Sequence, residues 1–554
     1  MEIEFRDNET MLSSVVNEII PCSLINKNFP DKKRYSDLNE DERIEILSFF
    51  ISKNQENPPD RLKINYLSHT NNDFEYKKEK YKEKDYISLM DIDDDYIRMY
   101  DARNVLGRFS LMAKYPDMMK THGIAEVSCV SSIFELLFLS KTEKNLKNIN
   151  IAIQPEDSQG ALSLISKIEK LYSNKLYRAH LSSLNDTQFI TFGPSDTGKQ
   201  GGKGMHKLNM SLAREHALLA KKYDIKLVRH VIVGGEHARC NGNFKEIFNE
   251  YGANNDEETR FMLAGCAEMR THLLSKHQAV NFFSEIYTMH IRSENQEPFT
   301  ELKIAQKTWQ KVVDRYQSNF FSSPSISEFL KNIARFDIVR GTAKGTRPPS
   351  RIYNIVEFES RPDAIRAIPW TRSILLSGLH SELIGAGAFT TLSDNEIAQK
   401  YQTDIYFRNY IKHIAYAAAR TDDALMWQMS GWSRPNNDTL VKLAASYEES
   451  DKLSIFNQLC WISHEIILAK NLVWRAIHGT SHTAPEYIST KDLIIPWKTL
   501  DKEVSWKERN LIPYKLVLLI TKEDKSFISS KAFFNFYSGF LESANTDYSM
   551  IYTS

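Results

Sequence analysis

The segment QFITFGPSDTGKQGG, residues 188–202, changes from apolar to polar at its midpoint. Its first part, QFITFG, is a short apolar run bounded by glycine, which predicts a β-strand. Its second part, PSDTGKQGG, is expected to form a tight, glycine-rich loop that holds Asp196 and Lys199. The stretch MHKLNMSLAREHALLAKKY, residues 205–223, then repeats apolar residues at helical spacing. The region therefore predicts one strand–loop–helix unit.

The same alternation extends to both sides of this unit. Expected strands are IAEVSCV (124–130), NINIAIQPED (148–157) and IKLVRHVIVGG (225–235). Expected helices between them are SSIFELLFLSK (131–141), which opens on a serine cap, and GALSLISKIEKLY (160–172). Alternating strands and helices with short links predict an α/β fold built on a parallel sheet.

Helices are expected elsewhere in the chain. Residues 1–120 are charged and helix-prone, and LNEDERIEILSFFI (38–51) has acidic residues in its first turn and an apolar face. Residues 255–340 and 395–554 also favour helices. The fold class predicted from these patterns is helix-rich α/β.

The composition bounds the function without defining it. The 554 residues include 71 Lys and Arg and 71 Asp and Glu, so bulk charge implies neither nucleic acid nor membrane as a partner. The five cysteines form no CxxC pair, which favours a reducing compartment over a disulfide scaffold or a zinc site. The first twenty residues lack a signal-peptide pattern, and no apolar run reaches the ~20 residues of a membrane span. A cytoplasmic location is expected.

Polar side chains follow three consecutive predicted strands. They are Glu156 and Asp157, Asp196 and Lys199, and His237 and Arg239. In parallel α/β folds the residues just past the carboxyl ends of the strands form the active face. Any one of these residues, taken alone, is equally consistent with an ordinary loop position, but three successive strand ends of this character indicate a site.

Two chemistries fit these positions. Glu156 and Asp196, on neighbouring strand ends, suit Mg²⁺ or Mn²⁺, which prefer oxygen ligands; the alternative is that each carboxylate caps the helix after it. His237 suits a general acid or base, or else a solvent-facing loop histidine. A second region, residues 340–372, holds six arginines and suits a phosphate or carboxylate, with a surface stretch paired to acids as the alternative. Those arginines are Arg340, Arg347, Arg351, Arg361, Arg366 and Arg372.

Several of these stretches, in this order, resemble the C-terminal half of the bacterial and plant type of phosphoenolpyruvate carboxylase. The matching segments are IEFRDNETMLSSVVNEI, IAIQPED, TFGPSDTGKQGG, IKLVRHVIVGGEHARCNG, GTRPPSR and AIRAIPWTRSILLSGLHSELIGAGAF. The last is the most specific, because RAIPW followed by a spaced GxG is unusual. Order and spacing hold over roughly residues 1–390.

The resemblance implies a (β/α)8-barrel-like core, incomplete in this chain, surrounded by helices. It divides the chain into a helical N-terminal segment with an active-site arginine (1–120), the barrel-like core (121–395) and a helical C-terminal region (396–554). It implies a lyase that joins bicarbonate to phosphoenolpyruvate and releases oxaloacetate and phosphate. The site residues it implies are Glu156 and Asp196 for the metal, Arg6 and Arg366 for the phosphate, Arg239 and Arg347 around the carboxylating group, and Lys199 beside the second metal ligand.

The chain also departs from the family pattern. The N-terminal half, with its TAHPTE histidine loop, has no counterpart, and His69 in LSHTNN is not expected to replace it. The first arginine of the family's GRGG loop is Val233 here, later glycines of that loop are Cys240 and Asn241, and His237 is new. The chain ends in SMIYTS, so the family's effector site is not expected.

Two hypotheses follow. The first is a metal-dependent, carboxylase-like enzyme for phosphoenolpyruvate or a related anion, with a diverged substrate or reaction as its variant. The second is a non-catalytic protein, or one half of a split carboxylase whose partner chain supplies the missing portion. Small anions are the expected ligands in the first case, and a homo-oligomer or a partner chain is the expected assembly.

Overall fold

The structure is a computed structural model that describes residues 4–20, 22–53, 105, 107–109, 111–117, 119–125, 129–141, 146, 148–155, 167–192, 194–233, 258–263, 306–336, 339, 362–450 and 452–478. The chain divides into two compact units. Unit 1 comprises residues 1–193, 212–231 and 256–260, and unit 2 comprises residues 194–211, 232–255 and 261–554.

A sheet of six described strands follows the chain in strict sequence order, β1-β2-β3-β4-β5-β6. Each of the first four strands is parallel to the next. The strands are β1 (Glu4–Asn8), β2 (Thr121–Ala125), β3 (Asn150–Gln154), β4 (Thr187–Phe192), β5 (Lys226–Val233) and β6 (Glu258–Leu263).

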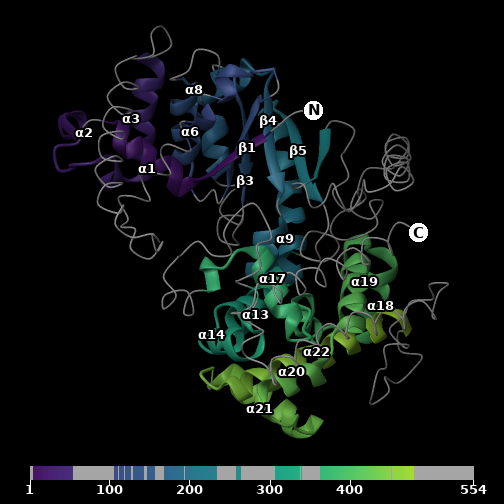
Figure 1. The fold of residues 1–554 in the computed structure, drawn as a ribbon. Coiled ribbons are helices and arrows are strands. Elements are labelled where there is room, and N and C mark those ends of the chain that lie inside the picture. Colours follow the sequence, from purple (N-terminus) through teal and green to yellow (C-terminus); the bar gives the residue numbers. More distant parts are fainter. Residues whose placement is uncertain are drawn as a thin grey trace, which may run out of the picture. The chain divides into compact units, whose positions relative to one another are not determined.

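The helices of unit 1 lie on one side of these strands (Figure 1). They include α1 (Glu9–Ile19), α2 (Cys22–Asn28), α3 (Glu40–Lys53), α6 (Ser131–Lys141) and α8 (Lys175–Ser182). Sequential parallel strands with helices on one side are the arrangement of (β/α) barrels, whereas doubly wound sheets reverse their strand order. The α/β class is therefore confirmed, and closure into an eight-stranded barrel stays a prediction.

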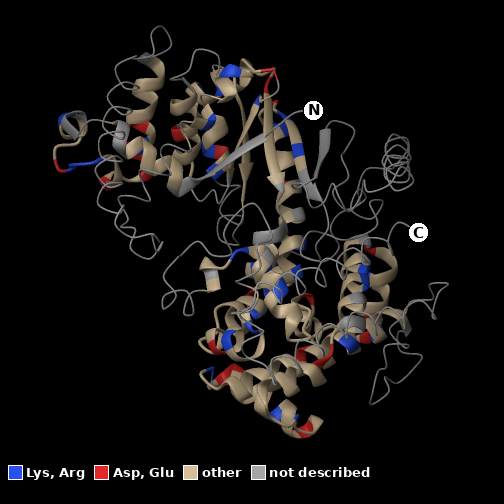
Figure 2. Cartoon of the chain, viewed as in Figure 1, with Lys and Arg blue, Asp and Glu red and all other residues tan. Residues whose placement is uncertain are grey.

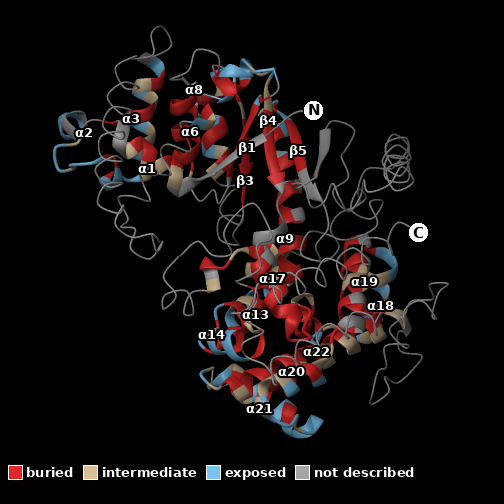
Figure 3. Ribbon diagram, in the orientation of Figure 1, coloured by how far each residue is buried: buried red, intermediate tan, exposed pale blue. Residues whose placement is uncertain are grey.

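Helix α6 is the centre of the helical layer in unit 1. It is buried along its described length (Figure 3), because α1 and α3 cover it on one side and β2 and β3 on the other. Its buried Glu135 accepts hydrogen bonds from the hydroxyls of Ser13, at 3.0 Å, and Tyr35, at 2.8 Å. These bonds satisfy Oε1 of a carboxylate that burial would otherwise penalise, and they connect the N-terminal segment to α6.

The described part of unit 2 is mostly helical. Its longer helices are α13 (Gln306–Tyr316), α17 (Ala367–Leu376), α18 (Asp394–Thr403), α19 (Ile405–Arg420), α20 (Asp423–Ser430), α21 (Asn437–Glu449) and α22 (Ile455–His478). Side-chain caps begin four of them: Ser393, Asp404, Asp422 and Asn436 each accept a backbone N–H of the first turn. This agrees with the helices predicted for residues after 395.

Most expected elements are found, with three corrections. The predicted helix over 38–51 is α3, and the predicted strands and helix around residues 131–192 correspond to α6, β3 and β4. The strand expected at 124–130 lies earlier, at 121–125. The strands β1 and β6 occur where only helices were expected. The division at residues 120 and 395 stays a prediction.

Among the described residues, positions of both charge signs occur on the helices of each unit, as the colours of Figure 2 show. Among the described residues, no helix is long and apolar enough to cross a membrane. Within the described part of the chain, neither Cys129 nor Cys460 forms a disulfide.

Candidate active site

The two predicted metal ligands follow adjacent parallel strands. In the register of β3 and β4, Ala152 lies opposite Phe189 and Ile153 opposite Ile190. The carboxyl ends of both strands therefore lie at the same edge of the sheet. Glu156 comes two residues after the end of β3 and lies outside the described residues; Asp196 comes four residues after the end of β4.

The segment predicted to be a glycine-rich loop is helical, and that prediction was wrong. Helix α9 runs from Pro194 to Lys222, so Asp196 lies in its first turn. Proline is well suited to the first position of a helix, and an acidic residue in the first turn complements the helix dipole. The helix is kinked at Gly202, whose φ of 60° and ψ of −158° are not helical.

The glycines of this segment allow α9 to pack closely against α13. A Cβ at Gly202 would lie 2.6 Å from Cδ2 of Tyr316, and one at Gly204 would lie 2.5 Å from Cγ1 of Val312. Such separations are too short for real side chains, so these positions exclude any residue larger than glycine. The glycines therefore serve helix packing, which the sequence pattern alone did not distinguish from a phosphate-binding loop.

Lys199 connects this helix to the arginine-containing RAIPW segment. Its side chain is buried, and its Nζ donates a hydrogen bond to the carbonyl oxygen of Ile365 at 2.8 Å. Its Nζ also lies 5.6 Å from the centroid of the Phe321 ring, within range of a cation–π interaction. Ile365 directly precedes Arg366, so the structure brings together two segments that carry predicted anion-binding residues.

Arg366 occupies the N-cap of α17. Its backbone is extended, with φ −74° and ψ 156°, and its side chain is half-buried. Arg372 lies further along the same helix and is buried. Of the six arginines in residues 340–372, these two fall among the described residues.

A basic group on α9 was missed by sequence analysis. Lys203, His206 and Lys207 are all buried, and Lys203 and Lys207 continue the four-residue spacing that begins at Lys199. Burial, with the charges of Lys203 and Lys207, holds the pKa of His206 well below its usual range. His413 of α19 experiences the same two charges, and its pKa is also well below the usual value, chiefly because it is buried. The i, i+4, i+8 lysine spacing was the signal that could have revealed this group.

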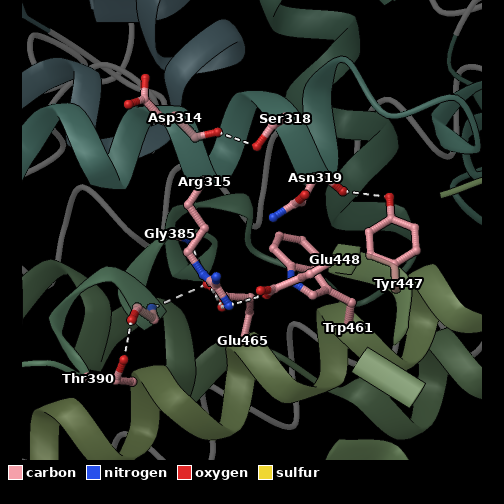
Figure 4. A network of polar contacts seen from close by, with 11 residues as sticks. Asp314, Arg315, Ser318, Asn319, Gly385, Thr390, Tyr447, Glu448, Trp461 and Glu465 are labelled. Atoms are coloured by element: carbon pink, nitrogen blue, oxygen red, sulfur yellow. Dashed lines mark hydrogen bonds and ion pairs between the residues drawn. The ribbon is translucent and has the colours of Figure 1, made fainter. Parts of the chain in front are cut away.

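The GxG motif after RAIPW is held by a buried ion pair (Figure 4). The Glu465 carboxylate accepts the backbone N–H of Gly385 at 2.8 Å and bonds Nε of Arg315 at 2.8 Å. Arg315 also pairs with Glu448 at 2.6 Å, and its guanidinium lies 5.6 Å from the centroid of the Trp461 ring. Burial lowers the pKa of Arg315, but its two carboxylate partners outweigh this and raise it above the usual value. These charges satisfy one another, so the network is structural.

The remaining predicted site residues are only partly described. Arg6 lies in β1 with its backbone opposite Gly123 of β2, and its side chain is not among those described. Val233 is the last residue of β5. His237, Arg239 and Arg347 lie outside the described residues. Their roles stay predictions.

A divalent-cation site at Glu156 and Asp196 stays a prediction, for which the residue types are suitable. Two carboxylates that follow adjacent strand ends supply the oxygen ligands that Mg²⁺ and Mn²⁺ prefer. Within the described ranges, no three histidine, cysteine or acidic side chains form a metal-binding group. Since Glu156 and the side chain of Asp196 fall outside those ranges, this finding concerns other places in the chain.

Comparison with known proteins points to one enzyme family. No protein-family model matches the chain. It is 22% identical over 368 residues to a phosphoenolpyruvate carboxylase of Xanthomonas euvesicatoria, and 21% identical over 368 residues to that of Xanthomonas oryzae. Each match covers 61% of this chain and 38% of the relative. The enzyme of Xanthomonas campestris is 20% identical over 280 residues, which is 46% of this chain and 29% of the relative.

The matched region thus spans about a third of the length of these relatives. These matches agree with the family resemblance of the motifs along residues 1–390. They also agree with the parallel sheet of unit 1, which that resemblance implies. The chain is similar to phosphoenolpyruvate carboxylases over part of its length.

Proposed function

We propose that the chain is a metal-dependent, carboxylase-like lyase that acts on phosphoenolpyruvate or a closely related anion, in a cytoplasmic setting. In the simplest case, bicarbonate and phosphoenolpyruvate give oxaloacetate and phosphate. The observation that supports this most is the hydrogen bond from Lys199 to Ile365. It joins the helix that carries Asp196 to the segment that carries Arg366, two of the residues that the family resemblance assigns to the metal and to the substrate phosphate.

The chain's own residues would bind and orient the anion. Arg6 and Arg366 would hold the phosphate, because guanidinium groups match phosphate oxygens in pairs. Arg239 and Arg347 would steady the carboxylating group beside the substrate. The buried Lys199, with Lys203 and Lys207 behind it on α9, gives this helix a positive interior side that favours a substrate with more than one negative charge.

Glu156 and Asp196 would hold Mg²⁺ or Mn²⁺, which supplies positive charge where an enolate oxygen develops. Proton transfer is proposed for His237, whose ordinary pKa lies near neutral pH.

An altered substrate is the second candidate, and Val233 favours it. This residue ends β5, at the same sheet edge as the ends of β3 and β4, and the family pattern has an arginine there. Loss of one positive charge from a phosphate site weakens binding of a doubly charged phosphate relative to a carboxylate. A related anion with less charge, or a diverged reaction, is therefore the alternative to oxaloacetate formation.

The test measures both products separately. The purified chain is mixed with phosphoenolpyruvate, bicarbonate and Mg²⁺ or Mn²⁺, and phosphate and oxaloacetate are followed in parallel. Asp196→Ala removes the proposed metal ligand. Asp438→Ala is the matched control, since Asp438 also lies in the first turn of a helix, α21, but has no proposed role. Each variant loses a helix-dipole contribution of about 0.3–1 kcal/mol, so only a change specific to Asp196→Ala reports chemistry.

The outcomes separate the hypotheses. Both products, lost in Asp196→Ala and kept in Asp438→Ala, support the carboxylase reaction. Phosphate without oxaloacetate supports a diverged reaction in which the enolate is not carboxylated. Neither product from a folded, monodisperse chain contradicts the proposal and favours a non-catalytic or partner-dependent protein.

A further inference from the structure

Helix α9 is kinked at Gly202, three residues after Lys199. Gly202 has φ 60° and ψ −158°, a combination that is essentially restricted to glycine. The hydrogen bond that the Lys199 carbonyl would accept in a regular helix comes from the N–H of residue 203, and this bond would span Gly202. A further donor to that carbonyl would hold the backbone next to the kink.

Tyr316 supplies that donor. It is the last residue of α13, its side chain is fully buried, and its hydroxyl donates to the Lys199 carbonyl oxygen at 3.0 Å. The same ring lies against Gly202, where a Cβ would come within 2.6 Å of Cδ2. One side chain thus both fills the space opened by the kink and satisfies the carbonyl beside it.

The tyrosine is itself held firmly. Its ring meets Phe320 edge to face, with centroids 5.4 Å apart. Burial raises the pKa of Tyr316 far above the physiological range, so the hydroxyl keeps its proton and remains a donor. Lys199 is consequently fastened at both ends, by its carbonyl to Tyr316 and by its ammonium to Ile365.

We propose that Tyr316 is a positioning residue that sets the direction of the first two turns of α9, and with them Asp196 and Lys199. It touches neither metal nor substrate; it acts through the backbone at the kink. The consequence that Tyr316 controls metal affinity rests on the proposed function. The orientation of the first turns of α9 is a separate, measurable property.

The experiment compares two tyrosine variants. Tyr316→Phe removes only the hydroxyl and leaves the ring against Gly202. Tyr447→Phe is the matched control, because the Tyr447 hydroxyl also donates to a backbone carbonyl, that of Asn319, at 2.8 Å. Both variants should lose similar thermal stability. Hydrogen–deuterium exchange over residues 194–204 and direct binding of Mn²⁺, measured by titration calorimetry, then separate them.

The expected result is specific to Tyr316→Phe. Exchange over residues 194–204 should be about fivefold faster than in the original chain, as loss of one hydrogen bond predicts, and unchanged in Tyr447→Phe. The affinity for Mn²⁺ should fall about tenfold in Tyr316→Phe alone, the lower end of what outer-shell partners contribute.

Two failures are distinguishable. If exchange over residues 194–204 is the same in both variants, Tyr316 does not hold the kink and the inference is overturned, whatever the metal does. If hydrogen–deuterium exchange over residues 194–204 is faster in Tyr316→Phe, but the variant binds Mn²⁺ with the same affinity as the original chain, the kink does not control metal binding. If the original chain binds no Mn²⁺, or Asp196→Ala binds it equally well, the proposed function fails, and the exchange data still decide the role of Tyr316.

Discussion

The carboxylate of Glu465 accepts the backbone N–H of Gly385 at 2.8 Å, across 80 positions of the chain. Its other oxygen pairs with Arg315 at 2.7 Å. One buried carboxylate therefore binds α22, α13 and the GxG motif together (Figure 4). This arrangement gives the most specific motif of the sequence a structural explanation.

Glu465→Gln should strongly destabilise unit 2. The substitution leaves the half-buried Arg315 with only one of its two carboxylates, and loss of one partner from a buried ion pair costs at most about 3–5 kcal/mol. Urea denaturation measures the loss. Glu448→Gln, at the more exposed partner of the same arginine, should cost distinctly less. Equal losses for the two variants would contradict the central role of Glu465.

Gly387→Ala should disturb the same network by steric conflict. A Cβ at this position would lie 2.5 Å from Oε1 of Glu465 and 2.7 Å from Nε of Arg315. Overpacking of this kind typically costs about 1–3 kcal/mol, which thermal unfolding would detect. Gly107→Ala is the control, since a Cβ there meets no atom within 4 Å. A Gly387→Ala protein as stable as Gly107→Ala would show that the network can move aside.

Stability should fall on acidification through a buried histidine of unit 1. His216 is buried and lies 2.7 Å from the Tyr172 hydroxyl, and burial, with the charge of Arg229, lowers its pKa from 6.5 to about 3. The folded protein therefore binds this proton less readily than the unfolded chain does. The contribution is fully present above about pH 6.5 and is lost as the pH falls toward 3, by up to about 1.4 kcal/mol per pH unit.

His216→Gln should make the free energy of unfolding less dependent on pH, by the contribution of one proton. Unfolding free energies at several pH values between 7 and 4 give the slope. Leu218→Gln, a change on the exposed side of the same helix, should leave the slope as it is. An unchanged slope in His216→Gln would mean that this imidazole does not stay neutral in the folded protein.

The basic group on α9 predicts linked titrations. Lys203 is the largest source of charge repulsion for both His206 and His413, although burial is the larger cause of their low pKa values. Lys203→Met should raise the pKa of both imidazoles and still leave them below the usual value. Nuclear magnetic resonance titration of labelled histidines measures this, with the exposed Lys442→Met as the control. If both pKa values stay where they are, the two imidazoles do not experience the charge of Lys203.

The local hydrophobic pattern predicted strands and helices correctly where all parts of a segment have the same surroundings. The apolar runs before Pro155 and Gly193 are strands, and the serine-capped run at residues 131–141 is a helix, because burial on a parallel sheet demands continuous apolar side chains. The strand Glu4–Asn8 was missed. Its sequence, EFRDN, is dominated by charged and polar residues, and only its pairing with β2 makes it a strand.

The sequence by itself determined four of the strands, the α/β class and the succession of motifs that resembles phosphoenolpyruvate carboxylases. Only the tertiary structure decided that PSDTGKQGG is a kinked helix, that its glycines face α13, and that Lys199 and Tyr316 meet across 117 positions. The reason is physical. Periodicity and turn chemistry are local, whereas the space left for a Cβ and the donor that reaches the Lys199 carbonyl depend on residues that are distant in sequence.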